Sequence, residues 1–382
     1  MSTSLIPQEL YREIASALYH PDNRSTLVSL ALVSTAWRHE SQRILFKSPG
    51  DDWFQTREMQ EHMRRREHVR FLEAILEQPD RLGAYVHSYD QLGLAFDPEV
   101  GKTIRDPMSS HIDGMHLWRV TCRALPLFVN LKRLAFIPSS ITPGLVVIRL
   151  CRSQLTRLLM FQNPAGDKQW TFLRGQRALL HFNSDSDLCN LPLDACPELQ
   201  SIILWTSKNM DLFLQSIAQR KNIVAFRLQG PNVVDHSAVS AQYRGTRFDH
   251  IRYLYLSHHY PFMHAFSNIV LLALHQWTIS TIKSLCDLDE LRTLALRHFD
   301  SNPNITKDKG TRETVARESR TRCRKLTHIV YILSDYGVHY HYTRFTLSPR
   351  QSASGEQEVL NIQFEDVSEY NPDALWWNVY DC

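Results

Sequence analysis

Histidine is the residue type that most suggests a metal site in this sequence, which contains 18 of them. The tightest groupings are His258 and His259 with His264, and His339 with His341, whose side chains would share one face of a strand. A zinc site needs three or four converging ligands, and the local sequence supplies two. We therefore expect these histidines at the surface or at strand edges, and we assign no metal ligand.

The common catalytic motifs are absent from the sequence. It has no G-x-x-x-x-G-K-[ST], G-x-G-x-x-G, G-x-S-x-G or H-E-x-x-H, and it has only 13 glycines. Cys189 and Cys196 flank the loop NLPLDAC without zinc-like spacing, so we interpret them as small buried apolar residues. Because no pair of nucleophile and base can be assembled, we assign no catalytic residue and no cofactor.

Charge and cysteine content indicate the compartment and the class of partner. With 43 basic and 40 acidic residues the net charge is +3, which does not favour nucleic acid or an anionic membrane as a partner. Seven cysteines, an odd number without a C-x-x-C pair, argue against a disulfide framework and for a reducing compartment. The start, MSTSLIPQEL, has no secretory signal, and no stretch approaches a membrane-spanning run of about 18 apolar residues. We predict a soluble protein of the cytoplasm, the nucleus or both.

The amino-terminal segment has the spacing of three short helices. Leu10 and Ile14 recur at helical spacing, and the segment HPDN then breaks this helix. Ser25 is placed to cap a second helix, and Ser34 or Thr35 to cap a third. A unit this small lies near the lower limit for an independent core, so its surplus of apolar surface implies a partner chain or docking onto the rest of the molecule.

The residue order of this segment resembles an F-box. The pattern is I6-P7-x-E9-L10-x-x-x-I14, then L27-x-x-L30-A31-L32-V33-S34-x-x-W37-R38, then L45-F46, with isoleucine at the first position where the family usually has leucine. In that family the three-helix motif docks onto the adaptor subunit of an SCF-type cullin-RING ubiquitin ligase. The resemblance implies an F-box domain at residues 1–50 that binds the adaptor and, through it, the cullin.

The residues that the resemblance assigns to adaptor binding are Ile6, Pro7, Leu10, Ile14, Leu27, Leu30, Val33 and Trp37. The other interpretation of the same periodicity is an ordinary helical cap over an adjoining core.

A helical connector, residues 51–80, follows. Val69, Leu72 and Ile75 form an apolar stripe that ends at Pro79. The basic run RRR on this helix is interleaved with glutamates, which favours a solvated face over a nuclear signal or a phosphate contact. The helix is either a spacer or the start of the next domain, and the apolar stripe favours the second.

The remainder of the chain, residues 81–382, repeats one short pattern. LKRLAF at 131, IVAFRL at 223, IRYLYL at 251 and LRTLAL at 291 have the L-x-x-L-x-L form of a leucine-rich repeat, in which a short strand turns alternate residues inward. A degenerate repeat with Leu180 and Phe182 fits the widest gap, and YDQLGLAF at 89 fits a first strand. Stretches between the strands, such as MDLFLQSIAQRK from Met210, have helical spacing.

We therefore predict an α/β fold in which a three-helix F-box precedes an irregular leucine-rich-repeat solenoid, with parallel strands on the concave side and helices outside. The alternative is a non-repetitive α/β domain whose parallel strands happen to be evenly spaced.

The strand pattern also predicts a binding surface. If the leucines point into the core, the alternate strand residues face the concave side. These alternates include aromatic and arginine side chains, the types most enriched at binding hot spots. The predicted substrate-binding residues are Arg157, Phe161, Trp205, Arg227, Tyr253, Tyr255, His275 and Arg297. Leu159 and Ile203 fall on the same face, so a partly apolar site and a face covered by another segment both remain open.

Two further stretches lie towards the carboxyl end. Residues 311–325 carry six basic and two acidic residues, which is typical of an exposed helix face but also suits a docking patch for an acidic or phosphorylated partner. The tail EDVSEYNPDALWWNVYDC brings Trp376, Trp377 and Tyr380 together, either as a cap on the last repeat or as a partner-binding motif.

Together with the resemblance, these patterns predict a substrate-receptor subunit of an SCF-type ubiquitin ligase. The helices would hold the adaptor, the repeat domain would hold an unidentified target protein, and catalysis would belong to other subunits. One alternative is a non-catalytic scaffold that delivers no substrate, and another is an enzyme whose site the motifs do not reveal. Neither nucleic acid nor a membrane is an expected partner.

Overall fold

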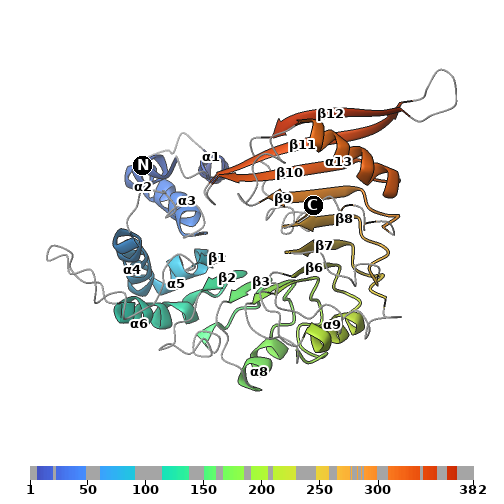
Figure 1. Cartoon of the computed structure of the whole chain (residues 1–382). Coiled ribbons are helices and arrows are strands. Elements are labelled where there is room, and N and C mark those ends of the chain that lie inside the picture. Colours follow the sequence, from blue (N-terminus) through green and yellow to red (C-terminus); the bar gives the residue numbers. More distant parts are fainter. Residues whose placement is uncertain are drawn as a thin grey trace. The chain divides into compact units, whose positions relative to one another are not determined.

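The computed structural model consists of two compact units (Figure 1). Unit 1 comprises Met1–Ser186 and Asp194–Glu198, and unit 2 comprises Asp187–Leu193 and Leu199–Cys382. The residues that the structure describes are 7–19, 23–48, 61–90, 114–136, 150–160, 167–184, 191–204, 210–228, 247–257, 265–275, 277, 282, 285, 288–298, 309–335, 339–350 and 359–367.

Helices open unit 1, as the sequence predicts. They are α1 (Gln8–Ala17), α2 (Arg24–Val33) and α3 (Thr35–Leu45). A shared core of Ala15, Leu27 and Ile44 holds them together. The predicted cap of α3 is confirmed, because the Ser34 hydroxyl oxygen accepts a hydrogen bond from the backbone N–H of Trp37 at 3.3 Å. The predicted Ser25 cap is wrong, because α2 already begins at Arg24.

The connector is part of the core of unit 1. Its described residues form α4 (Glu61–Glu77) and the start of the short helix α5 (Pro79–Leu82), and the 3-10 turn η2 (Gly83–Tyr85) follows directly. Pro79 begins a new helical turn, where its missing N–H is not needed. The stripe of Val69, Leu72 and Ile75 is buried, and α4 packs against α6 (Gly114–Ala124). This helix is therefore not an exposed spacer.

A close backbone contact joins η2 to the segment after α6. That segment begins with the turn η4 (Leu125–Leu127), and a Cβ atom on residue 83 would lie 2.5 Å from the Leu127 carbonyl oxygen. Gly83 is required there because only glycine allows this approach. The Asn130 side-chain amide reinforces the contact by donating to the Ala84 carbonyl at 2.8 Å.

The strands follow one another in the sheet in the order of the sequence, from β1 to β12. Unit 1 contributes the parallel strands β1 (Ser88–Asp90), β2 (Arg133–Phe136), β3 (Arg157–Met160) and β4 (His181–Ser184), with helix α8 (Asp167–Gly175) between the last two. The degenerate repeat exists, but its buried pair is Leu179 with Phe182, whereas Leu180 is only half-buried. The first strand lies at the start of YDQLGLAF, and the rest of that stretch lies outside the described residues.

Unit 2 continues the pattern with short parallel strands and ends in an antiparallel hairpin. Its strands are β5 (Ser201–Leu204), β6 (Ala225–Leu228), β7 (Tyr253–Leu256), β8 (Leu271–Leu274), β9 (Thr293–His298), β10 (His328–Asp335), β11 (His339–Arg350) and β12 (Val359–Val367). Its described helices are α9 (Met210–Gln219) and α13 (Lys309–Arg322). The strands from β5 to β10 are parallel, whereas β10, β11 and β12 pair antiparallel.

This arrangement confirms the α/β class and a largely parallel sheet, which is consistent with a leucine-rich-repeat-like solenoid. The antiparallel end is a departure from the prediction. Its cause is the short connection from Asp335 to His339, because a tight turn can join only antiparallel strands. Among the described residues, no helix is both long and apolar enough to span a bilayer.

One backbone turn recurs before the strands. The N–H of the first leucine-type residue of a repeat donates to the carbonyl three residues earlier, as in Leu131 to Phe128, Ile251 to Phe248 and Leu326 to Cys323, at 2.9–3.1 Å. The repeat is therefore longer than the L-x-x-L-x-L pattern that the sequence revealed. The side chain at this additional position is buried in each of these three repeats, at Phe128, Phe248 and Cys323.

A second regularity links each repeat to the next. The carbonyl of the residue before one strand accepts two N–H groups from the start of the following strand, as Val224 does from Arg252 and Tyr253 at 2.8 and 3.0 Å. In unit 1 this series begins on the helices, because the Lys47 carbonyl accepts from His87 and Ser88 at 2.8 and 3.0 Å. The end of α3 therefore occupies the place of a preceding repeat.

Candidate interaction surfaces

The first candidate surface consists of apolar side chains on α1 and α2. Leu10 and Ile14 of α1 and Val28, Leu32 and Val33 of α2 are all exposed, and Leu32 and Val33 are 78 % and 68 % exposed. We call these five residues the apolar set. Burying such a side chain gains about 1.5–3 kcal/mol, so five of them left in water on two short helices suggest a contact with another chain.

The three-helix core beneath the apolar set is fixed by polar contacts as well as by packing. The Arg43 guanidinium donates to the Glu40 carboxylate at 2.8 Å within α3, and to the Ser16 hydroxyl of α1 at 3.1 Å. The Arg38 guanidinium donates to the Ala31 carbonyl of α2 at 3.3 Å. These bonds join α3 to both other helices, so the helices that carry the apolar set are held in place by hydrogen bonds.

The residues assigned to adaptor binding fall into different environments. Pro7, Leu10, Ile14 and Val33 are exposed, and Leu30 is half-buried. Ile6 lies outside the described residues. The structure thus leaves most of the assigned side chains accessible to a partner, and their binding of an adaptor stays a prediction.

Two of the assigned residues lie in the interior of the helical unit instead. Leu27 is fully buried against Ala15 and Ile44, so in this structure it holds the helices together, and its assignment to adaptor binding stays a prediction. Trp37 is half-buried, with its ring packed edge-on against Tyr11 at 4.7 Å between centroids. Val28 and Leu32, which the assignment omitted, are exposed on α2.

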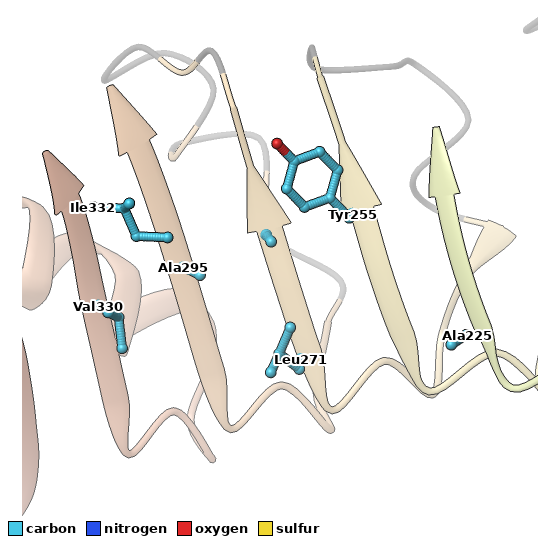
Figure 2. Close-up of a cluster of buried hydrophobic side chains, with 7 residues drawn as sticks. Ala225, Tyr255, Leu271, Ala295, Val330 and Ile332 are labelled. Carbon is cyan, nitrogen blue, oxygen red and sulfur yellow. The ribbon is translucent and has the colours of Figure 1, made fainter. Parts of the chain in front are cut away.

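The second candidate surface is the strand face of unit 2 opposite the leucine positions. Figure 2 shows Ala225, Tyr255, Leu271, Ala295, Val330 and Ile332 on this face of the strands β6 to β10. The parallel register explains the grouping, because Arg227, Tyr255, Ala273, Ala295 and Val330 are successive partners across these strands. The face is mostly apolar and its members are buried.

The structure contradicts the expectation that this face is open at its central polar residues. Arg227 and Tyr255 are only 7 % and 3 % exposed, with the guanidinium 4.1 Å from the centre of the tyrosine ring. The Tyr255 ring also lies 6.3 Å from the His275 ring. Side chains buried in this way are not presented to a partner, so the prediction of an open hot spot is wrong at Arg227 and Tyr255.

The remaining predicted substrate-binding residues are dispersed. Arg157 of unit 1 is half-buried, as are Tyr253 and His275 of unit 2. Arg297 lies in β9, and Phe161 and Trp205 lie outside the described residues. Of the two apolar members of this face, Leu159 is half-buried and Ile203 is buried. Substrate binding by these residues stays a prediction.

The described part of the chain holds no group of three side chains suited to a metal ion. His258, His259 and His264 lie outside it, and His339 and His341 lie in β11. Burial raises the pKa of the Cys122 and Cys151 thiols to about 11, which disfavours the reactive thiolate at neutral pH.

No protein-family model matches this chain, and no curated protein sequence matches it.

Proposed function

We propose that this chain is a substrate-receptor subunit of an SCF-type cullin-RING ubiquitin ligase, in which α1–α3 bind the adaptor subunit and the repeat-like sheet domain binds a target protein. The observation that carries the proposal is the apolar set, which exposes five large side chains on helices that already have a core. The F-box-like order of residues supplies the class of partner.

A receptor of this kind works by positioning. It holds a lysine of the target near the ubiquitin carried by other subunits, which raises the effective concentration of the two groups. The hydrogen bonds from the His87 and Ser88 N–H groups to the Lys47 carbonyl support this role. They join the segment that ends α3 directly to the start of β1. The raised thiol pKa values of Cys122 and Cys151 also suit a subunit that does not itself carry ubiquitin on these cysteines.

Native purification of the tagged full-length chain tests the proposal. Adaptor and cullin should co-purify with the native chain, and proteasome inhibition should enrich a bound target. The Leu32→Asp variant should lose adaptor and cullin together, because it places a charge in an apolar contact. Adaptor without cullin would indicate a scaffold instead, and neither subunit with the native chain would refute the proposal.

A further inference from the structure

Three cations lie at the edge of unit 2 where the parallel strands begin. Arg252 and Arg292 are exposed and directly precede β7 and β9, and Lys325 lies in the turn before β10. We call Arg252, Arg292 and Lys325 the basic edge. Lys325 belongs to the basic segment 311–325, whereas the two arginines are distant from it along the chain.

Backbone hydrogen bonds fix the spacing of the basic edge. The Arg252 carbonyl accepts from Val270 at 2.8 Å, the Val270 carbonyl from Arg292 at 2.9 Å, and the Arg292 carbonyl from Thr327 at 2.8 Å. Arg252 and Arg292 are thus separated by one uncharged rung, which places their backbones about 10 Å apart at ordinary strand spacing. The fold itself therefore places the two arginines in one row, with one uncharged residue between them.

Carboxylates also lie among these cations, and Glu290 is paired with one of them. The Lys325 ammonium pairs with Glu290 at 2.5 Å, with about half of the lysine side chain still exposed. Hydrogen bonding to Lys325 lowers the pKa of Glu290, and the charges of Lys325, Arg292 and Arg252 contribute to the same shift. Counting Arg247 and Arg324, the segments directly before β7, β9 and β10 hold five basic and three acidic residues, so a surplus of positive charge remains.

We propose that the basic edge is a docking site for an acidic segment of a partner protein. Carboxylates at several positions of such a segment would complement separate cations, as one carboxylate of the chain already does at Glu290. Nucleic acid fits less well, because Asp249, Asp289 and Glu290 alternate with the cations in these turns. A segment with spaced carboxylates can place them opposite the cations alone, whereas a continuous run of phosphates would also meet the acids. This inference concerns unit 2 and holds whether or not α1–α3 bind an adaptor.

Fluorescence anisotropy with the purified full-length chain tests this site. The probe is a labelled peptide of alternating glutamate and serine, and its control is the same peptide with glutamine in place of glutamate. Arg252→Ala with Arg292→Ala should weaken binding about fivefold to tenfold, because two exposed ion pairs are lost. Glu290→Gln should strengthen binding, because it removes the competing carboxylate and releases Lys325.

The matched control is Arg119→Ala with Arg123→Ala, which removes the same charge from exposed positions of α6 in unit 1. It should leave binding unchanged, and thermal unfolding should show that every variant is folded. Three results would overturn the proposal: no preference for the glutamate peptide over the glutamine peptide, equal weakening by the control variant, or weakening by Glu290→Gln. Tighter binding of an oligothymidine probe than of the acidic peptide would also overturn it, in favour of nucleic acid.

Discussion

At the scale of single residues, burial separates the side chains of α2 that stabilise the fold from those available to a partner. Leu27 is fully buried and Val28, its neighbour in sequence, is 47 % exposed. Leu27→Ala should lower the free energy of unfolding by about 2–5 kcal/mol, because it leaves a cavity between the helices. Val28→Ala should change it by less than about 0.5 kcal/mol.

Denaturant unfolding, followed by a signal from α1–α3, measures both changes. Similar values for the two variants would show that Leu27 is not the core residue described above. Periodicity alone could not make this distinction, because α2 has apolar residues on more than one side. Which side becomes the core is decided by α1 and α3, which supply Ala15 and Ile44.

His68 gives unit 1 a specific response to acid. It is almost fully buried, with its ring edge-on to Tyr89, and burial lowers its pKa from 6.5 to about 4. In the unfolded chain the same group binds its proton near pH 6.5. The contribution of His68 to the free energy of unfolding should therefore be fully present above pH 6.5 and decrease as the pH falls towards 4. Below pH 4 this contribution should level off, after a total loss on the order of 3 kcal/mol.

The matched variant is His68→Leu, which keeps an apolar side chain of similar size and cannot titrate. The difference in unfolding free energy between the native chain and this variant, measured from pH 7.5 to pH 4, isolates the histidine from the carboxylates. A difference that stays constant over this range would show that His68 does not have a lowered pKa.

At the scale of elements, the recurring turn before each strand is the main addition to the predicted repeat. In two neighbouring repeats of unit 2 the residue three positions before the first apolar residue is Phe248 or Phe266, and these two rings are fully buried and stacked at 4.7 Å. Phe248→Ala should cost about 3–5 kcal/mol. The double variant with Phe266→Ala should cost less than the sum of the single variants by about 0.5–1.5 kcal/mol, because both single changes remove the same ring contact.

Denaturant unfolding measures this cycle, and Leu193→Ala is its control, since Leu193 is also in unit 2 but exposed. Strict additivity of the two phenylalanine variants would contradict the stacked contact.

The link from α3 to β1 makes a prediction about the junction of helices and sheet. Ser88→Pro removes the N–H that donates to the Lys47 carbonyl, whereas Ser88→Ala keeps it. The proline variant alone should lower the hydrogen-exchange protection of α3 and β2, with α9 and β6 of unit 2 as internal references. Equal protection in both variants would show that this bond does not couple the helices to the sheet.

The elements were predictable to different degrees. The parallel strands followed from the L-x-x-L-x-L pattern, because period-two alternation is a local property of the chain. The antiparallel end did not, because it depends on which strands meet. The buried state of Arg227 and Tyr255 was also missed, because alternation separates the two faces of a strand but does not say whether a face is covered.

At the scale of the whole molecule, the proposal assigns two binding tasks to one chain. Exposed helical side chains would hold a ligase adaptor, while the sheet domain, with its basic edge, would hold a second protein that carries an acidic segment. The apolar set could be foreseen only in part from the sequence, since a surplus of apolar residues was evident but Leu32 and Val28 were not assigned to it. A surface that needs a partner is recognised from what the chain's own packing leaves uncovered.

The most direct test is the affinity of the full-length chain for the purified adaptor subunit of its own species, measured by calorimetry. Leu32→Asp and Val33→Asp should each weaken binding at least about a hundredfold, because each places an unpaired charge against an apolar surface. Val129→Asp, at a position of unit 1 that is 62 % exposed but lies outside the helices, should bind like the native chain. Undiminished binding by Leu32→Asp and Val33→Asp, or no binding by the native chain, would contradict the proposed function.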